Sequence, residues 1–158
     1  MLRYGVIHPE ILGALAAAGH GSTVLIADGH YPVSTGTARD ARTVWLNLRP
    51  GLLTATQVLE ALVDVVAIET ATVMQPPADQ AEPEAFDDFQ AVVAPLPLSR
   101  LERFAFYAAA RQPDLALTIA TGDVRTYANL LLTVGVAIPS QPSQPSPPTD
   151  GRSSRPGV

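Results

Sequence analysis

Short apolar runs alternate with helix-like segments through residues 1–138, and this alternation constrains the fold more than any other feature of the chain. The run STVLIAD, residues 22–28, is continuously apolar between its polar ends, as expected of a strand that is buried on both faces. Amphipathic segments before and after such strands favour helices that pack on a central sheet. We therefore expect a single compact domain of the α/β class.

Local signals predict where the individual elements begin and end. Gly19 predicts the end of the first helix. Either Thr54 or Thr56 is expected to cap the second helix, and the spacing of Ser99 and Glu102 is that of a capping box at the start of the last one. The predicted helices cover residues 8–19, 53–66, 84–94 and 99–112, and the predicted strands cover residues 22–28, 42–48, 68–74, 114–123 and 127–138.

The composition changes at residue 139, where the segment PSQPSQPSPPTDGRSSRPGV begins. Proline, serine, glutamine and glycine dominate it, so it cannot bury enough apolar surface to offset the entropy lost on ordering. We predict one folded domain over residues 1–138 and a disordered tail without a catalytic role over residues 139–158.

Several classes of chemistry are excluded by missing residue types. The chain has no cysteine and no lysine, which excludes disulfides, thiolate nucleophiles, Schiff-base chemistry and a phosphate-binding P-loop lysine. A formal net charge of −5 argues against nucleic-acid binding, and the three histidines do not have metal-ligand spacing. No apolar run reaches the ~18 residues of a membrane span, and no signal-peptide pattern opens the chain, so the expected location is the cytoplasm.

Polar residues gather where the predicted strands end. Asp28 ends the first strand, residues 121–123 end the strand before the last, and the connection RTYAN, residues 125–129, follows. Ligands of open α/β sheets bind at the carboxyl ends of strands, which makes these residues candidates for a site. His20 lies at the other end of the first strand, so only a loop or a neighbouring subunit would bring it there.

Each candidate also has a purely structural interpretation. A histidine that follows a helix-ending glycine, as His20 does, is usually a solvated residue at the negative end of the helix dipole. Asp28 and Gly29 form a common turn dipeptide, and Tyr127 and Asn129 could simply shape a turn before a strand. Residue types alone therefore leave both interpretations open.

Four stretches in this order, HPEILGALAAAGHG, VLIADGHYP, RFAFYAAAR and TGDVRTYANLLLTVGV, resemble the family that contains the fucose mutarotases and the ribose pyranases. The resemblance covers residues 5–138 and leaves out only the tail. It implies a mixed central sheet between helices, and interconversion of the anomers, or of the pyranose and furanose forms, of a free monosaccharide. It also implies that neither a metal nor an organic cofactor is needed.

The resemblance assigns roles to individual residues. His20, in the Gly-His turn, is the implied acid–base residue. Arg103 precedes Phe-Ala-Phe-Tyr as in the fucose branch, whereas the ribose branch places a histidine there, so the sequence sides with the fucose branch. The implied sugar-binding residues are Asp28, Arg103, Tyr127, Ala128 and Asn129. His30 and Tyr31 are expected only as wall residues of the pocket.

The chemistry of mutarotation fits these residues. Opening a hemiacetal moves one proton onto the ring oxygen and another off the anomeric hydroxyl, and an imidazole performs such transfers near neutral pH. Members of the resembled family assemble into rings with pockets between adjacent subunits. The resemblance therefore implies a ring-shaped homo-oligomer in which His20 and Asp28 come from one chain and the segment 127–129 from the next.

Three other functions stay open at this point. The first is a D-ribose pyranase, because residues 75–98 depart from the family pattern close to the substrate-facing region and leave the choice between L-fucose and D-ribose open. The second is a non-catalytic sugar-binding protein that assists transport. The third is a plain α/β interaction module, which would make the ordered set of matching stretches a coincidence.

Overall fold

The computed structural model describes residues 5–137 and contains one six-stranded sheet in the order β2-β5-β1-β6-β3-β4. The strands are β1 Thr23–Ala27, β2 Arg42–Trp45, β3 Ile68–Met74, β4 Leu98–Leu101, β5 Leu115–Ala120 and β6 Leu130–Val134. Five strands are parallel, and β6 runs antiparallel between β1 and β3. The expected α/β fold with a mixed sheet is confirmed, while the predicted tail lies outside the described residues.

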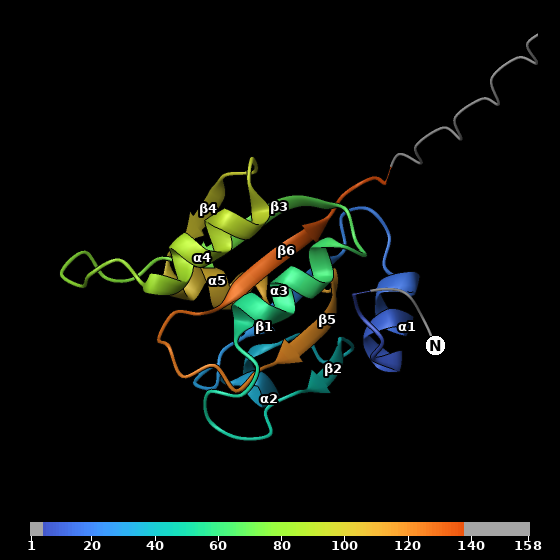
Figure 1. Ribbon diagram of the computed structural model, residues 1–158, viewed down its shortest axis with the longest axis horizontal. Helices are drawn as coiled ribbons and strands as arrows, with labels where there is room; N and C mark the ends of the chain where they lie inside the picture. The colour runs from blue at the N-terminus through green and yellow to red at the C-terminus, as the bar shows by residue number, and fades with distance from the viewer. Residues whose placement is uncertain (1–4, 138–158) are drawn as a thin grey trace, which may run out of the picture.

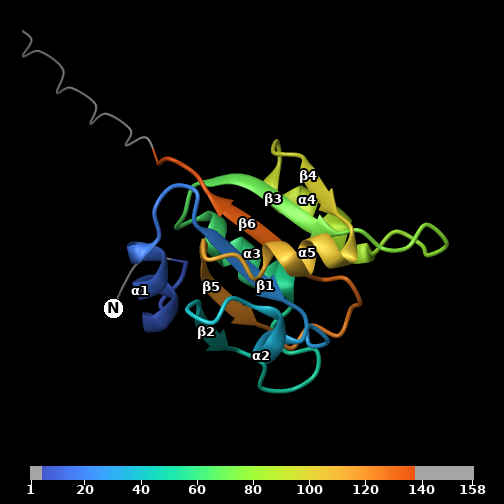
Figure 2. The same ribbon diagram turned by 180° about the vertical axis from the view of Figure 1, so that it is seen from behind.

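Helices cover both faces of this sheet. The helices are α1 Pro9–Ala17, α2 Val33–Gly36, α3 Ala55–Val63, α4 Glu84–Val93 and α5 Arg103–Ala109. In Figure 1, α3 and α4 lie in front of the strands, and Figure 2 shows α5 on the opposite face. None of the helices within residues 5–137 is long and apolar enough to span a bilayer.

The continuous apolar run of β1 reflects burial in two separate cores. Val24 and Ile26 pack into the core under α1, α3 and α4, whereas Leu25 and Ala27 pack into the core under α2 and α5. Because side chains of a strand alternate between faces, a strand with a core on each side needs an apolar residue at every position.

The predicted helix over residues 99–112 is wrong at its beginning. Ser99 lies in β4, where it pairs with Thr72 of β3, and α5 begins only at Arg103. The carboxylate of Glu102 accepts hydrogen bonds from the backbone N–H groups of Phe104 and Ala105, so Glu102 itself is the N-cap. Pairing with β3 holds the backbone of Ser99 in an extended conformation and displaces the apparent capping box.

Two other boundaries bear on the site. Thr54 caps α3 with a complete capping box to Gln57, which confirms one of the two expected caps. The last strand begins at Leu130 rather than at residue 127, because Tyr127 has a left-handed φ of 62° that a strand cannot accommodate. Residues 127–129 therefore form a loop at the end of the sheet where the carboxyl termini of the parallel strands lie.

Candidate functional site

A cavity of about 340 Å³ lies at the end of the sheet where the parallel strands finish and β6 begins. Its volume falls within the range of small-molecule pockets. Four segments line it: the turn after β1, the loop after β3, the start of α5 and the loop before β6. Four residues implied by the family resemblance meet in this cavity: Asp28, Arg103, Tyr127 and Asn129.

Asp28 and Asn129 form a reciprocal pair on the floor of the cavity, with exposed fractions of only 3% and 4%. The Asn129 side-chain oxygen accepts from the backbone N–H of Asp28 at 2.9 Å, and its Nδ2 donates to Asp28 Oδ2 at 2.9 Å. The backbone N–H of His30 donates to Asp28 Oδ1, also at 2.9 Å. These contacts fix the orientation of the Asn129 amide. They also mean that each of the two Asp28 carboxylate oxygens accepts an N–H group.

The environment of Asp28 also changes its acidity. Burial raises the pKa of the Asp28 carboxyl above its ordinary value, although the N–H of His30 and the amide of Asn129 partly offset this effect. Each carboxylate oxygen has more than one acceptor position. Asp28 can therefore hold its protein donors and still accept hydrogen bonds from sugar hydroxyls.

Arg103 and Tyr127 form the polar rim of the cavity. A guanidinium N–H of Arg103 donates to the Tyr127 hydroxyl at 2.6 Å, and the guanidinium carbon lies 5.7 Å from the centre of the Tyr127 ring. The left-handed backbone of Tyr127 is a costly conformation for a bulky residue. Such conformations persist where surrounding contacts hold them, and here the contact with Arg103 joins α5 to the loop before β6.

Two aromatic residues form one wall. The rings of Tyr31 and Tyr107 meet edge to face with their centres 5.4 Å apart. Tyr31 donates a hydrogen bond to the Gly36 carbonyl at 3.0 Å, and burial raises the pKa of its phenol, so it stays a fixed donor. His30, expected as a wall residue, also lines the cavity. An apolar wall facing a polar floor is a typical arrangement for small polar ligands.

Two residues implied by the resemblance lie elsewhere within one chain. Ala128 is fully buried in the core under α1, α3 and α4. His20 precedes β1 at the opposite end of the strands, and the five residues of β1 separate it from Asp28 by roughly 17 Å. One chain alone therefore does not bring His20 to the cavity. The expected division of the site, with His20 and Asp28 from one chain and residues 127–129 from the next, is wrong, because Tyr127 and Asn129 meet Asp28 within the same chain and His20 lies apart from them.

At the amino end of β1, His20 has a partner that the sequence did not indicate. Its Nε2 lies 2.8 Å from a carboxylate oxygen of Glu69, and both side chains are more than half exposed. Only the pairing of β1 and β3 with β6 brings these residues together, since 49 positions separate them in the chain. Gln80 and Tyr107 of the cavity were missed for the same reason.

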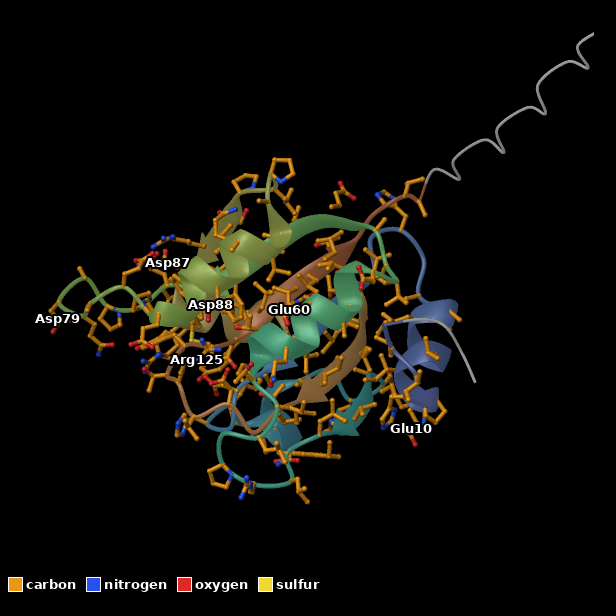
Figure 3. All side chains as sticks on the ribbon, in the orientation of Figure 1. Glu10, Glu60, Asp79, Asp87, Asp88 and Arg125 are labelled. Atoms are coloured by element: carbon orange, nitrogen blue, oxygen red, sulfur yellow. The ribbon has the colours of Figure 1, made fainter. Side chains whose placement is uncertain are left out.

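A buried ion pair supports the loop that carries Tyr127. Asp123, at 1% exposed, accepts from the Arg125 side chain at 2.7 Å and from the backbone N–H of Ala55, the first residue of α3, at 2.9 Å. Arg125 also donates to Asp88 of α4 at 2.7 Å, and Figure 3 shows these two side chains next to each other. Burial alone would raise the pKa of the Asp123 carboxyl, but the hydrogen bonds from Arg125 and Ala55 outweigh it and hold the pKa below its ordinary value.

We expect Arg125→Met to lower the free energy of unfolding by about 3 kcal/mol at neutral pH, because it leaves the buried Asp123 carboxylate without its cation. Since folding lowers the pKa of Asp123, the stability from this pair is present above pH ~4 and is lost as the pH falls through the lowered value. Urea unfolding should therefore show a smaller difference from wild type near pH ~3.

Arg39→Met is the matched control for this measurement, since Arg39 makes no hydrogen bond or ion pair within residues 5–137. It should change the free energy of unfolding by less than about 0.5 kcal/mol. A difference between Arg125→Met and wild type that is the same at both pH values would contradict the assignment.

The donor and acceptor set of the cavity suits an uncharged polyhydroxylated ligand. Asp28 offers acceptors, Arg103 offers a planar set of donors, and the Tyr127 hydroxyl both donates and accepts. Among residues 5–137, no three His, Cys, Asp or Glu side chains come together in a way that would hold a metal ion.

Known proteins resemble this chain over nearly all of the described residues. The family described as the RbsD / FucU transport protein family matches residues 1–137. D-ribose pyranase 2 of Streptomyces griseus is 34% identical over 139 residues, covering 86% of this chain and 98% of the relative. Human fucose mutarotase is 28% identical over 144 residues, covering 83% and 90%.

The solved structure of FucU from Bifidobacterium longum has a TM-score of 0.74 and 30% sequence identity, and it covers 85% of this chain and 99% of that one. The likeness therefore extends over the whole described fold rather than over isolated motifs. This chain belongs to the RbsD / FucU transport protein family.

Proposed function

We propose that this protein is a monosaccharide mutarotase, an isomerase that interconverts the α and β anomers of a free sugar, with L-fucose as the first candidate. The observation that carries the proposal is the cavity in which Asp28, Arg103, Tyr127 and Asn129 meet. Family relatives named mutarotases and pyranases, which are isomerases, support the reaction class.

The mechanism requires an acid–base residue in the cavity. We assign this role to His20 of a neighbouring subunit, because His20 lies at the opposite end of the strands within its own chain. Asp28 and Asn129 bind and orient the sugar hydroxyls, while Arg103 and Tyr127 contact it from the rim. A ring-shaped homo-oligomer with pockets between adjacent subunits would complete such a site.

A second candidate is D-ribose pyranase. The relative from Streptomyces griseus, at 34% identity, carries that name, whereas Arg103 in place of a histidine favours the fucose branch. Gln80 lines the cavity and belongs to the 75–98 stretch, which departs from the family pattern, so it would contribute to the choice of sugar.

Saturation-transfer NMR with L-fucose, D-ribose and D-galactose tests the proposal. We expect the intact protein to transfer magnetisation between the anomers of fucose. Exchange confined to the pyranose and furanose forms of ribose would identify a pyranase instead. Binding of a sugar without faster exchange would identify a non-catalytic accessory protein, and that result would contradict the mutarotase proposal.

A further inference from the structure

The contact between His20 and Glu69 lies outside the cavity, yet it holds the imidazole to which the proposed function assigns the proton transfer. Nε2 of His20 lies 2.8 Å from Oε2 of Glu69, and both side chains are more than half exposed. An exposed ion pair contributes little to stability, so the fold itself gains little from this contact. The backbone around both residues nevertheless departs from regular geometry in ways that bring them together.

His20 is held in a tight turn that is fixed to β6. The backbone N–H of Ser22 donates to the Gly19 carbonyl at 3.0 Å, which closes a four-residue turn with His20 and Gly21 at its centre. Gly21 has a φ of 84°, and a positive φ at the third position alone defines a type II turn, which favours glycine there. The N–H of Gly21 donates to the Val134 carbonyl at 2.9 Å. The turn therefore anchors His20 beside the last residue of β6.

Glu69 is the extra residue of a β-bulge in β3. Where β3 pairs with β6, Ile68 lies opposite Val134 and Thr70 lies opposite Thr133, so no residue of β6 lies opposite Glu69. A bulge interrupts the ladder of hydrogen bonds and redirects a side chain, and bulges are frequent next to active sites. The bulge therefore places the Glu69 side chain at the same end of β6 as the turn that carries His20.

Gly135, which follows β6, leaves room for Glu69 at this end of the strand. β6 lies between β1 and β3 (Figure 1), so a contact between the two flanking strands has to cross it. A Cβ added at Gly135 would lie 3.2 Å from Glu69 Cβ and 3.3 Å from Glu69 N, which is closer than ordinary van der Waals contact. Because residue 135 has no side chain, Glu69 can lie against its backbone and reach His20.

The contact determines which ring nitrogen of His20 can exchange a proton. A carboxylate only accepts hydrogen bonds, so Nε2 carries the proton that it shares with Glu69. Nδ1 has no hydrogen-bond partner among residues 5–137, and it is therefore the nitrogen that is left for a ligand. A carboxylate that accepts from one ring nitrogen fixes both the tautomer and the orientation of a histidine.

We infer that Glu69 is a positioning residue for the acid–base step: it accepts from Nε2 of His20 and leaves Nδ1 as the atom that gives and takes the proton. The inference rests on the proposed mutarotase function, in which His20 is the acid–base residue. Glu69 acts through His20 rather than on the sugar, and it keeps its charge while Nδ1 loses and regains one proton. The carboxylate also stabilises the imidazolium that forms whenever Nδ1 is protonated.

Replacing the carboxylate tests this role. Glu69→Leu removes the hydrogen-bond acceptor with a side chain of similar size, whereas Glu69→Gln keeps an acceptor for Nε2. We expect Glu69→Leu to lower kcat for anomer exchange by about 10-fold with less than about a twofold change in KM. Glu69→Gln should lower kcat by less than about threefold, because the hydrogen bond that orients the ring is kept.

Glu60→Leu is the matched control for the loss of an exposed carboxylate. Glu60 lies on α3 (Figure 3) and makes no hydrogen bond or ion pair within residues 5–137. This variant should keep the wild-type kcat.

The His20→Gln background separates a positioning role from a purely structural one. If Glu69 acts only through His20, adding Glu69→Leu to His20→Gln should lower the residual rate by less than about twofold. This rate is measured at enzyme concentrations high enough for it to exceed the spontaneous exchange. Nitrogen-15 NMR of the neutral His20 ring gives a second readout, and it should show the proton on Nε2 and the lone pair on Nδ1.

Three results would each overturn the inference: a wild-type rate in Glu69→Leu, equal losses from Glu69→Leu in both backgrounds, or a neutral His20 ring that carries its proton on Nδ1. With an active wild type, these results refute only the role of Glu69 and leave the mutarotase proposal intact. A wild type that exchanges none of the three sugars refutes the proposed function and this inference together.

Discussion

His20→Gln is expected to lower the rate of enzyme-catalysed anomer exchange by about 10²–10⁴-fold, the usual contribution of a positioned acid–base group. The fold should survive, because the His20 side chain is 60% exposed and its contact with Glu69 is a surface pair, which contributes little to stability. Saturation-transfer NMR on the sugar identified as substrate measures the rate, and circular dichroism checks the fold. An unchanged rate would remove His20 from the mechanism.

Glu69→Gln is the matched control for this variant. It keeps a hydrogen-bond acceptor near His20 Nε2 but removes the charge. We expect a smaller loss of rate than in His20→Gln, because the histidine can still transfer its proton.

Mixed oligomers test whether His20 acts on the cavity of a neighbour. His20→Gln chains lack the acid–base group and Asp28→Asn chains lack the sugar-binding carboxylate, so each preparation alone should have little activity. If a site takes His20 from one chain and Asp28 from the next, random mixing in equal amounts restores about one quarter of the sites. No recovery from a mixture that has reassembled to the wild-type mass would contradict a shared site.

The second large effect is expected at Asp28, where Asp28→Asn should weaken sugar binding by about 10²-fold, since hydrogen bonds to a charged group contribute about 1.5–3 kcal/mol each. The variant is nearly isosteric, yet it cannot keep all the protein contacts. Both oxygens of Asp28 accept from N–H donors, so the new amide must turn its NH₂ group toward one of them. We also expect the free energy of unfolding to fall by about 1–3 kcal/mol.

The double variant Asp28→Asn/Asn129→Asp is the control for this conflict. The exchanged pair can restore every hydrogen bond, because the new amide donates to the new carboxylate, which still accepts the backbone N–H of residue 28. We expect stability in urea to recover while sugar affinity, measured by titration calorimetry, stays low. Recovery of affinity would show that the position of the charge does not matter.

Local patterns in the sequence were enough to predict the parts of the fold that depend on neighbouring residues. The uninterrupted apolar run of β1 predicted burial on both faces, and Thr54 predicted a helix cap. The capping-box spacing at Ser99 predicted a helix start wrongly, because the backbone of this segment forms hydrogen bonds with β3 instead. It becomes the strand β4, which begins at Leu98. Local patterns of this kind do not indicate which distant strands pair with each other.

The candidate site depends on that pairing. Asp28 and Asn129 are 101 positions apart and meet only because β6 enters the sheet antiparallel beside β1. The resemblance placed them in one pocket, but their reciprocal hydrogen bonds follow from the register of these two strands. The same is true of the hydrogen bond between His30 and Val124, 94 positions apart, which the DGH turn alone did not suggest.

His20 and the cavity lie at opposite ends of β1, so a site shared between subunits would make activity in a cell depend on assembly. With each site divided between two chains, turnover per chain would depend on protein concentration. Dilution below the dissociation constant of the assembly would abolish activity without unfolding any chain, and concentrating the sample would restore it. Expression level alone would then act as a threshold for sugar isomerisation.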